Sequence, residues 1–90
     1  MSNLKVLEQA ILTYGREHQL NIAIEEMSEL TKEICKYKRR NENQAEIIEE
    51  MADVYIMLEQ MKMIFGISEQ QINEQIDYKV ERLKGRLEDE

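Results

Sequence analysis

Two short acidic clusters contain the residues of this sequence whose types and spacing are suited to chemistry. The first carries Glu25, Glu26 and Glu29, and the second carries Glu50 and Asp53. Each cluster lies inside an apolar pattern with helical spacing, so the carboxylates should project from two helices into a shared space. Removing unpaired anions from water is costly, and a divalent cation is the simplest counter-charge for several converging acids. Magnesium prefers oxygen ligands, so the clusters predict a magnesium site that acts on a phosphorylated compound.

Four helices joined by short turns are the elements that must position these acids. Apolar residues recur at helical spacing along most of the chain, and no stretch alternates for long enough to compete as a strand. The absence of proline also favours helices. The sequence therefore predicts an all-α, antiparallel four-helix bundle. Its helices are predicted over residues 4–14, from 16 or 17 to 39, from about 43 to 64 or 65, and 69–87.

Residues typical of helix ends support these limits. A small polar residue before a helix can cap its first N–H groups, and glycine after a helix accommodates a positive φ. An acid or amide three residues after the cap completes a capping box. The predicted end signals are Ser2 or Asn3, Gly15, Gly66, and the capping-box pairs Asn43 with Glu46 and Ser68 with Gln71.

Each predicted helix carries an apolar stripe, which we expect to form the core. A neighbouring stripe on the second and third helices mixes acids with apolar residues, and it is predicted to border an interface. The expected core stripes are Leu4, Leu7, Ile11 and Tyr14; Leu20, Ala23 or Ile24, Met27, Leu30 and Ile34; Ile47, Met51, Val54, Leu58 and Met61; and Ile72, Ile76, Val80, Leu83 and Leu87.

A register argument connects the two acidic clusters. In an antiparallel hairpin, residues at equal depth have position numbers with a constant sum. If the turn lies near residues 39 and 40, Glu29 faces Glu50 and Glu26 faces Asp53. Four carboxylates then occupy two adjacent levels of one hairpin, which suits one or two magnesium ions.

Two other interpretations of the acids are open from the residues themselves. An acidic run on a helix is ordinarily a solvated surface, but acids four positions apart repel one another unless a cation is present. A di-iron site would need Glu-x-x-His pairs. His18 is the only histidine and forms no such pair. Ligation by oxygen alone therefore favours magnesium, with manganese as the substitute.

Length and charge limit the classes of protein to which the chain can belong. Its 90 residues make one domain, 1–90, whose core is marginal, so we expect oligomerisation to complete it. The net charge of −7 argues against nucleic-acid binding and against an anionic membrane surface. No apolar run is long enough to span a membrane, and no secretory signal is recognisable. The single cysteine, Cys35, favours a reducing, cytoplasmic setting.

The pattern EExxE over residues 25–29, followed by ExxD over 50–53, resembles the MazG-like nucleotide pyrophosphohydrolases. The resemblance covers nearly the whole chain, from Gln19 through IEEMSEL and EEMADVYIMLEQ to the basic helix with Lys79 and Arg82. The KYKRR turn and the KxxR near the end are most similar to the short versions found in bacteria and their phages.

The resemblance implies an enzyme of nucleotide-pool housekeeping. Such an enzyme hydrolyses a nucleoside triphosphate at the α–β phosphate bond and releases a monophosphate and pyrophosphate. Carried over by position, the magnesium ligands would be Glu26, Glu29, Glu50 and Asp53. Glu25 would orient or deprotonate the attacking water.

The last helix could hold the phosphates. Lys79 and Arg82 lie one helical turn apart and would clamp phosphate oxygens. A solvated helix flank that pairs with acids is an equally good interpretation of these cations. Because four helices leave one side of the acidic groove open, we expect a second subunit to complete the pocket in a homodimer or homotetramer.

Two alternative functions remain open beside this pyrophosphohydrolase activity. The first keeps the scaffold and changes the substrate to that of a dUTP or phosphoribosyl-ATP pyrophosphohydrolase. The second is a non-catalytic acidic helical module for oligomerisation or regulation, in which Glu26→Gln or Asp53→Asn changes metal affinity little.

Overall fold

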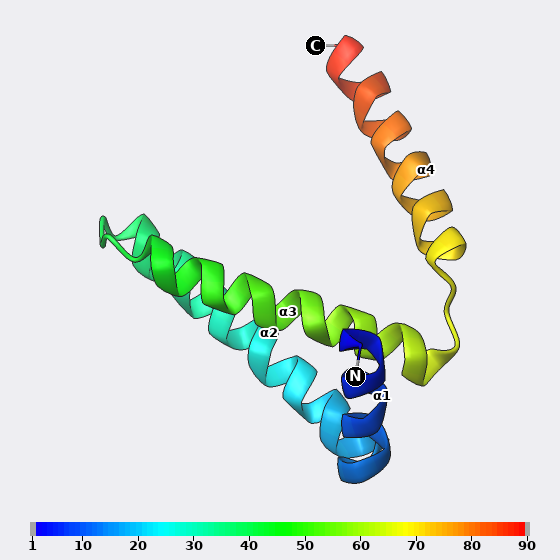
Figure 1. The fold of residues 1–90 in the computed structure, drawn as a ribbon. Helices are drawn as coiled ribbons and strands as arrows, with labels where there is room; N and C mark the ends of the chain where they lie inside the picture. Colours follow the sequence, from blue (N-terminus) through cyan, green and yellow to red (C-terminus); the bar gives the residue numbers. More distant parts are fainter. Residues whose placement is uncertain (1, 90) are drawn as a thin grey trace.

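Residues 2–89 are described by a computed structural model, and over this range the chain forms four α-helices and no strand (Figure 1). The helices are α1 (Asn3–Tyr14), α2 (Arg16–Lys38), α3 (Gln44–Phe65) and α4 (Glu69–Glu88). The predicted all-α class and the four predicted helices are confirmed. None of the helices in this range combines the length and apolar character that crossing a bilayer requires.

The helix ends follow the predicted chemistry at three places. The Ser2 side chain accepts a hydrogen bond from the Lys5 N–H at 3.2 Å and so caps α1. Gly66 ends α3 in the left-handed conformation, with φ 66° and ψ 36°. Before α4, Ser68 and Gln71 form the full capping box, each side chain bonding the other's backbone N–H.

The capping box predicted at Asn43 and Glu46 is wrong. Asn43 precedes α3, but its side chain makes no hydrogen bond to the start of that helix. Its Nδ2 atom instead donates to the backbone oxygen of Glu33 at 2.8 Å and to the Glu33 carboxylate at 3.3 Å. Both residues are only 7% exposed. Burial against α2 thus redirects the amide from the local cap to a contact that closes the hairpin.

The antiparallel pair α2 and α3 is the centre of the fold, and α1 packs against both near the open end of the hairpin (Figure 1). The two helices meet through the stripe that mixes polar and apolar residues. Gln19 Nε2 donates to Gln60 Oε1 at 2.8 Å across this contact. The residue numbers of Gln19 and Gln60 add up to the same value as those of Glu26 and Asp53, which confirms the predicted register of the hairpin. The residues of the described range that are buried in one copy are Gln19, Ala23, Glu33, Asn43, Met57 and Gln60.

The predicted core stripes are confirmed only in part in a single copy: Ala23 is buried and Leu30 and Val54 are half-buried, but many other members are exposed. Ile24 is 61% exposed, Met51 43% and Leu58 46%. On α1, Leu4 and Tyr14 are also exposed. The reason is geometric: the mixed stripe faces the partner helix, so the neighbouring apolar stripes are turned outward. Within the described part of one chain, no other element covers these stripes.

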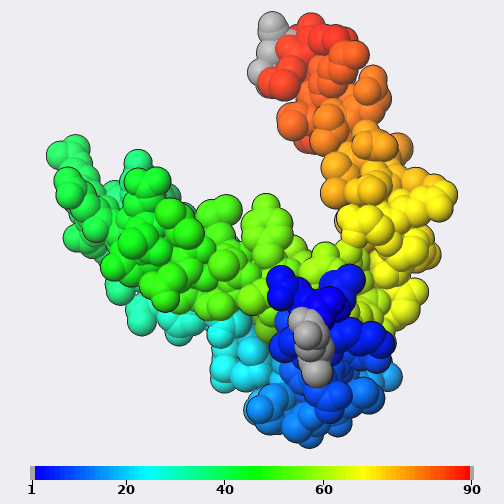
Figure 2. Space-filling model, in the orientation of Figure 1, coloured from blue at the N-terminus to red at the C-terminus, as the bar shows by residue number. Residues whose placement is uncertain are grey.

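The last helix stands apart from the other three (Figures 1 and 2). Lys62 on α3 pairs with Glu69, which fixes the first turn of α4, and with Glu59 at 2.9 Å. Beyond that turn, α4 makes at most marginal contact with the described part of the chain. The radius of gyration is 16.3 Å, whereas a compact chain of this length has about 12 Å. Within one copy, the packed bundle therefore consists of α1, α2 and α3.

Replacing Gln60 by leucine is expected to destabilise the fold. Gln60 is 2% exposed; it accepts from Gln19 and donates to the Leu7 backbone oxygen at 3.1 Å. Gln60→Leu keeps the volume but leaves the Gln19 amide, which is 7% exposed, without its partner, and this should lower the free energy of unfolding by about 1–3 kcal/mol. Urea denaturation measures the change. Gln70→Leu, at an exposed position, is the control, and equal effects from the two variants would refute this role.

Candidate metal centre

Three carboxylates meet in the middle of the α2–α3 hairpin. One oxygen each from Glu26, Glu50 and Asp53 lies within 4.8 Å of the others. Glu50 and Asp53 are three positions apart, so they share one face of α3 about a turn apart. The register of the hairpin places Glu26 of α2 opposite that face. All three side chains are half-buried.

The electrostatics of this trio oppose its full ionisation. Partial burial, a hydrogen bond to Asp53 and the negative charges of Asp53 and Glu50 raise the pKa of Glu26 from 4.5 to about 7. Burial and the charges of Asp53 and Glu29 also raise the pKa of Glu50. Without a cation, Glu26 therefore retains a proton at pH values where an ordinary glutamate is ionised.

The site lacks a protein counter-charge within residues 2–89. The salt bridges found there use other acids, namely Glu29, Glu33, Glu59 and Glu69. One oxygen of Glu50, Oε2, is buried and has no hydrogen-bond partner. Clustered hard oxygen donors, one of them buried without a partner, fit a divalent cation of the magnesium type. Glu26, Glu50 and Asp53 would hold it.

Two acids of the predicted set lie outside this trio. Glu29 is about half exposed, and its carboxylate is 4.0 Å from Lys32 Nζ. It remains close enough for its charge to raise the pKa of Glu50. Glu25 is exposed and is not among the three converging acids. The structure therefore places Glu29 at the edge of the site and Glu25 on the solvent side of α2.

The predicted phosphate-binding cations are not brought to the trio within one copy. Lys79 and Arg82 are exposed on α4, and this helix points away from the hairpin (Figure 1). Arg82 instead lies over the ring of Tyr78, with its guanidinium carbon 5.7 Å from the ring centroid. If these cations contact a ligand at the acids, they do so from a different copy or after α4 moves.

The polar contacts that fix the register of the hairpin were not predicted. They are the Gln19–Gln60 pair at one end and the Glu33–Asn43 pair at the other. A signal for them exists, because Gln19, Glu26 and Glu33 follow one another at seven-residue spacing and so lie on one face of α2.

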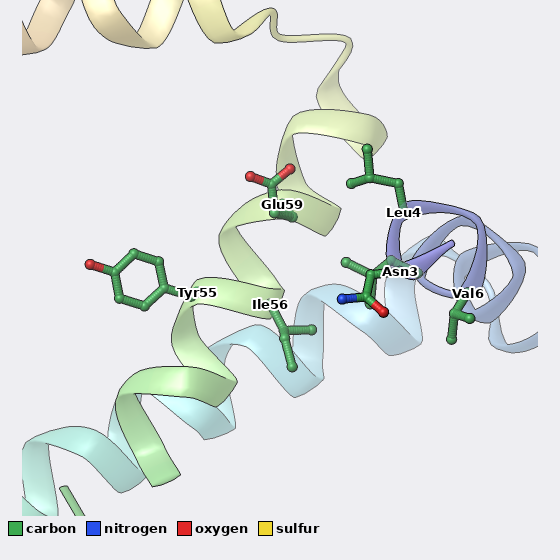
Figure 3. Close-up of a pocket in the computed structure, with 7 residues that line it drawn as sticks. Asn3, Leu4, Val6, Tyr55, Ile56 and Glu59 are labelled. Atoms are coloured by element: carbon green, nitrogen blue, oxygen red, sulfur yellow. The ribbon is translucent and has the colours of Figure 1, made fainter. Parts of the chain in front are cut away.

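A hollow of about 480 Å³ lies between α1 and α3, away from the acids (Figure 3). Leu4 and Val6 of α1 and Tyr55 and Ile56 of α3 line it, and Glu59 is its one charged residue. Its walls are apolar, so it does not suit a phosphate chain. This hollow therefore adds nothing to the acidic trio, none of whose residues lines it.

The chain was compared with known proteins in three ways. A scan against protein-family models, a search of curated proteins and a search of solved structures each found no match.

Proposed function

We propose that this protein is a magnesium-dependent nucleoside triphosphate pyrophosphohydrolase. The observation that carries the proposal is the convergence of Glu26, Glu50 and Asp53 within 4.8 Å, where no ion pair among residues 2–89 involves them. The spacing of these acids in EExxE and ExxD, which resembles the MazG-like enzymes, supports this choice among phosphate chemistries.

In the proposed reaction, water attacks the α-phosphorus of the nucleotide. A bond forms between the water oxygen and phosphorus, and the bond to the α–β bridging oxygen breaks. Nucleoside monophosphate and pyrophosphate leave. Magnesium, or manganese in its place, would neutralise the phosphate chain when bound. Positioning and charge stabilisation supply most of the catalysis in such transfers.

The residues of the chain have separate roles in this proposal. Glu26, Glu50 and Asp53 hold the cation, and Glu29 adds negative charge at the edge. Glu25, exposed one position before Glu26, orients the attacking water and accepts its proton. Its solvent-side position leaves it free of the cation.

Self-association is part of the same proposal. In this proposal Lys79 and Arg82 reach the phosphates from a second copy, in a homodimer or homotetramer. The substrate pool is cytoplasmic, which agrees with the setting expected from the single cysteine.

The test is a panel of canonical, deoxy and damaged nucleoside triphosphates with magnesium, scored for pyrophosphate. The panel includes dUTP and phosphoribosyl-ATP, so a preference for either identifies the related enzyme class. Pyrophosphate from at least one compound supports the proposal. Orthophosphate in its place would mean that a different bond is cut, and no product from any compound would contradict the activity.

A second candidate function is favoured by one observation. Among residues 2–89, nineteen large hydrophobic side chains are exposed in a single copy, which is typical of a chain that works by assembly. In that case the chain is a non-catalytic oligomerisation or regulatory module. It would assemble normally, hydrolyse none of the panel, and keep the same magnesium affinity in Asp53→Asn.

Glu25→Gln separates proton transfer from metal binding. We expect the rate of pyrophosphate release to fall about 100-fold, the usual range for loss of a general base. Magnesium should still raise the melting temperature as in the unaltered protein, because Glu25 lies outside the trio. If Glu25→Gln also abolishes the magnesium effect, Glu25 is a ligand and the assigned role is wrong.

A further inference from the structure

The hairpin has an apolar face that the rest of residues 2–89 leaves largely uncovered in one copy. The helices α2 and α3 meet through their mixed polar and apolar stripes. Each residue of the apolar face comes one position later in the sequence than a residue of such a stripe: Met27 comes after Glu26, and Leu58 comes after Met57. One position is a rotation of about 100° in a fixed sense. Because α2 and α3 are antiparallel, equal rotations bring both apolar stripes to the same side. We call this surface the hairpin face; it includes Ile24, Met27, Ile34, Met51, Val54 and Leu58.

The fourth helix has an apolar stripe without a partner as well. Ile76, Val80, Leu83 and Leu87 are spaced by four, three and four positions, and each is between 48% and 61% exposed. They share a face with Ile72, which lines a hollow in the angle between α3 and α4 together with Leu58. The apolar stripe of α4 therefore faces the angle between α3 and α4, next to the hairpin face.

The exposed area shows how much surface is left to cover. One copy exposes 7430 Å², whereas a compact monomer of 10.8 kDa exposes about 5,500 Å². The excess is about 1,900 Å² per copy, or about 3,800 Å² for two. That falls inside the range of about 2,000–5,000 Å² buried by obligate homodimers.

We propose that α4 of each copy lies along the hairpin face of a second copy, in a reciprocal two-fold dimer. The lengths match: the α4 stripe from Ile72 to Leu87 spans about 22 Å, and the hairpin face from Leu20 to Ile34 spans about 21 Å. Most of the stability of a helix in a protein comes from the packing of its apolar face, and α4 has little such packing within the described part of one copy. Docking into the groove between two apolar stripes stabilises it.

The charges of the two surfaces favour the same pairing. From Lys79 to Arg86, α4 carries four cations and one acid, whereas α3 carries five acids and one cation. Opposite charges would attract this stretch of α4, although not the helix as a whole, to α3. The same step would carry Lys79 and Arg82 onto the acidic hairpin of the partner copy. The dimer itself does not depend on catalysis.

The first test uses two substitutions by glutamate on α4, one on the apolar side of the helix and one on another side. Val80 is 57% exposed and Tyr78 60% exposed in one copy, but only Val80 belongs to the apolar stripe. Sedimentation equilibrium should give the unaltered protein twice the 10.8 kDa of one chain, or an even multiple. Val80→Glu should raise the dissociation constant about 100-fold or more, because a carboxylate would be buried in an apolar groove. Tyr78→Glu should change it less than about 3-fold.

The second test concerns the other half of the interface. Leu58→Glu, on the hairpin face, should weaken the dimer as Val80→Glu does, while circular dichroism shows that the α2–α3 helices persist. An equimolar mixture of the two variants should recover dimer, since one of the two reciprocal contacts is then unaltered. A monomeric unaltered protein, or equal weakening by Val80→Glu and Tyr78→Glu, would overturn the proposal. A dimer lost with Leu58→Glu but unaffected by Val80→Glu would also overturn it, since the hairpins would then pack face to face.

Discussion

Asp53→Asn is expected to lower the rate of pyrophosphate release from the preferred nucleotide by about 100-fold or more. The substitution keeps the shape of the side chain and removes one of the three converging negative charges. A cation held by Glu26, Glu50 and Asp53 would lose a ligand, while the fold would keep its hairpin. The measurement is the initial rate of pyrophosphate release at a fixed magnesium concentration.

Asp77→Asn is the matched control for this prediction. It makes the same chemical change at an exposed position on α4 that belongs neither to the acidic trio nor to the apolar stripe. Its rate should stay within about 2-fold of the unaltered protein. Equal rates for Asp53→Asn and the unaltered protein would remove Asp53 from the site.

The melting temperature of the metal-free protein is expected to fall by several degrees as the pH rises from about 4.5 to about 7. The pKa of Glu26 is raised from 4.5 to about 7 in the folded chain, so the folded state binds more protons than the unfolded state in this window. Stability therefore decreases with rising pH there, and the full penalty persists above pH 7. Magnesium should reverse the loss, and more strongly at higher pH, because it competes with the Glu26 proton.

Glu26→Gln distinguishes this cause from a general pH effect. The variant removes the titrating carboxyl, so its melting temperature should vary much less between pH 4.5 and 7. Above pH 7 and without metal it should be more stable than the unaltered protein, yet magnesium should no longer stabilise it. Glu46→Gln, one turn before Glu50 and exposed, should keep both behaviours. Calorimetric scans at a fixed chain concentration measure all three proteins, and an unchanged pH dependence in Glu26→Gln would contradict the assignment.

The helices and the register of the hairpin could be predicted because both depend on local or pairwise rules. Helical spacing, Ser68 with Gln71, and Gly66 each act within a few residues. The constant sum of facing positions then brought Glu26 to Asp53, as the structure has it. The same rule paired Glu50 with Glu29, whereas in the structure Glu50 converges with Glu26 and Asp53, and Glu29 lies at the edge beside Lys32.

The choice of buried stripe could not be predicted in the same way. The apolar stripe and the mixed stripe of α2 lie only about 100° apart, and hydrophobicity favours burial of the apolar one. In a single copy, the Gln19–Gln60 and Glu33–Asn43 contacts instead face inward. The hydrophobic pattern of the sequence indicates which helix surface is apolar, but not whether the same chain or a second copy covers that surface.

The position of α4 depends on the short connection over residues 66–68, and the apolar stripe on α4 alone does not determine it. The Lys62–Glu69 pair and Gly66 fix where the helix starts and how it leaves α3. The sequence pattern therefore predicted the helix correctly, but not its separation from the hairpin, which leaves the expected core stripe of α4 exposed in one copy. Lys79 and Arg82 lie far from the trio in one copy for the same reason.

The central claim is that Glu26, Glu50 and Asp53 hold a divalent cation. Titration of the metal-free protein with manganese, followed by the electron paramagnetic resonance signal of the free ion, tests it most directly because it requires no substrate. Saturable binding that magnesium displaces, that weakens at least about 10-fold in Asp53→Asn and that is unchanged in Asp77→Asn is the predicted result. Absence of saturable binding in the unaltered protein, or equal binding in the two variants, would contradict the claim.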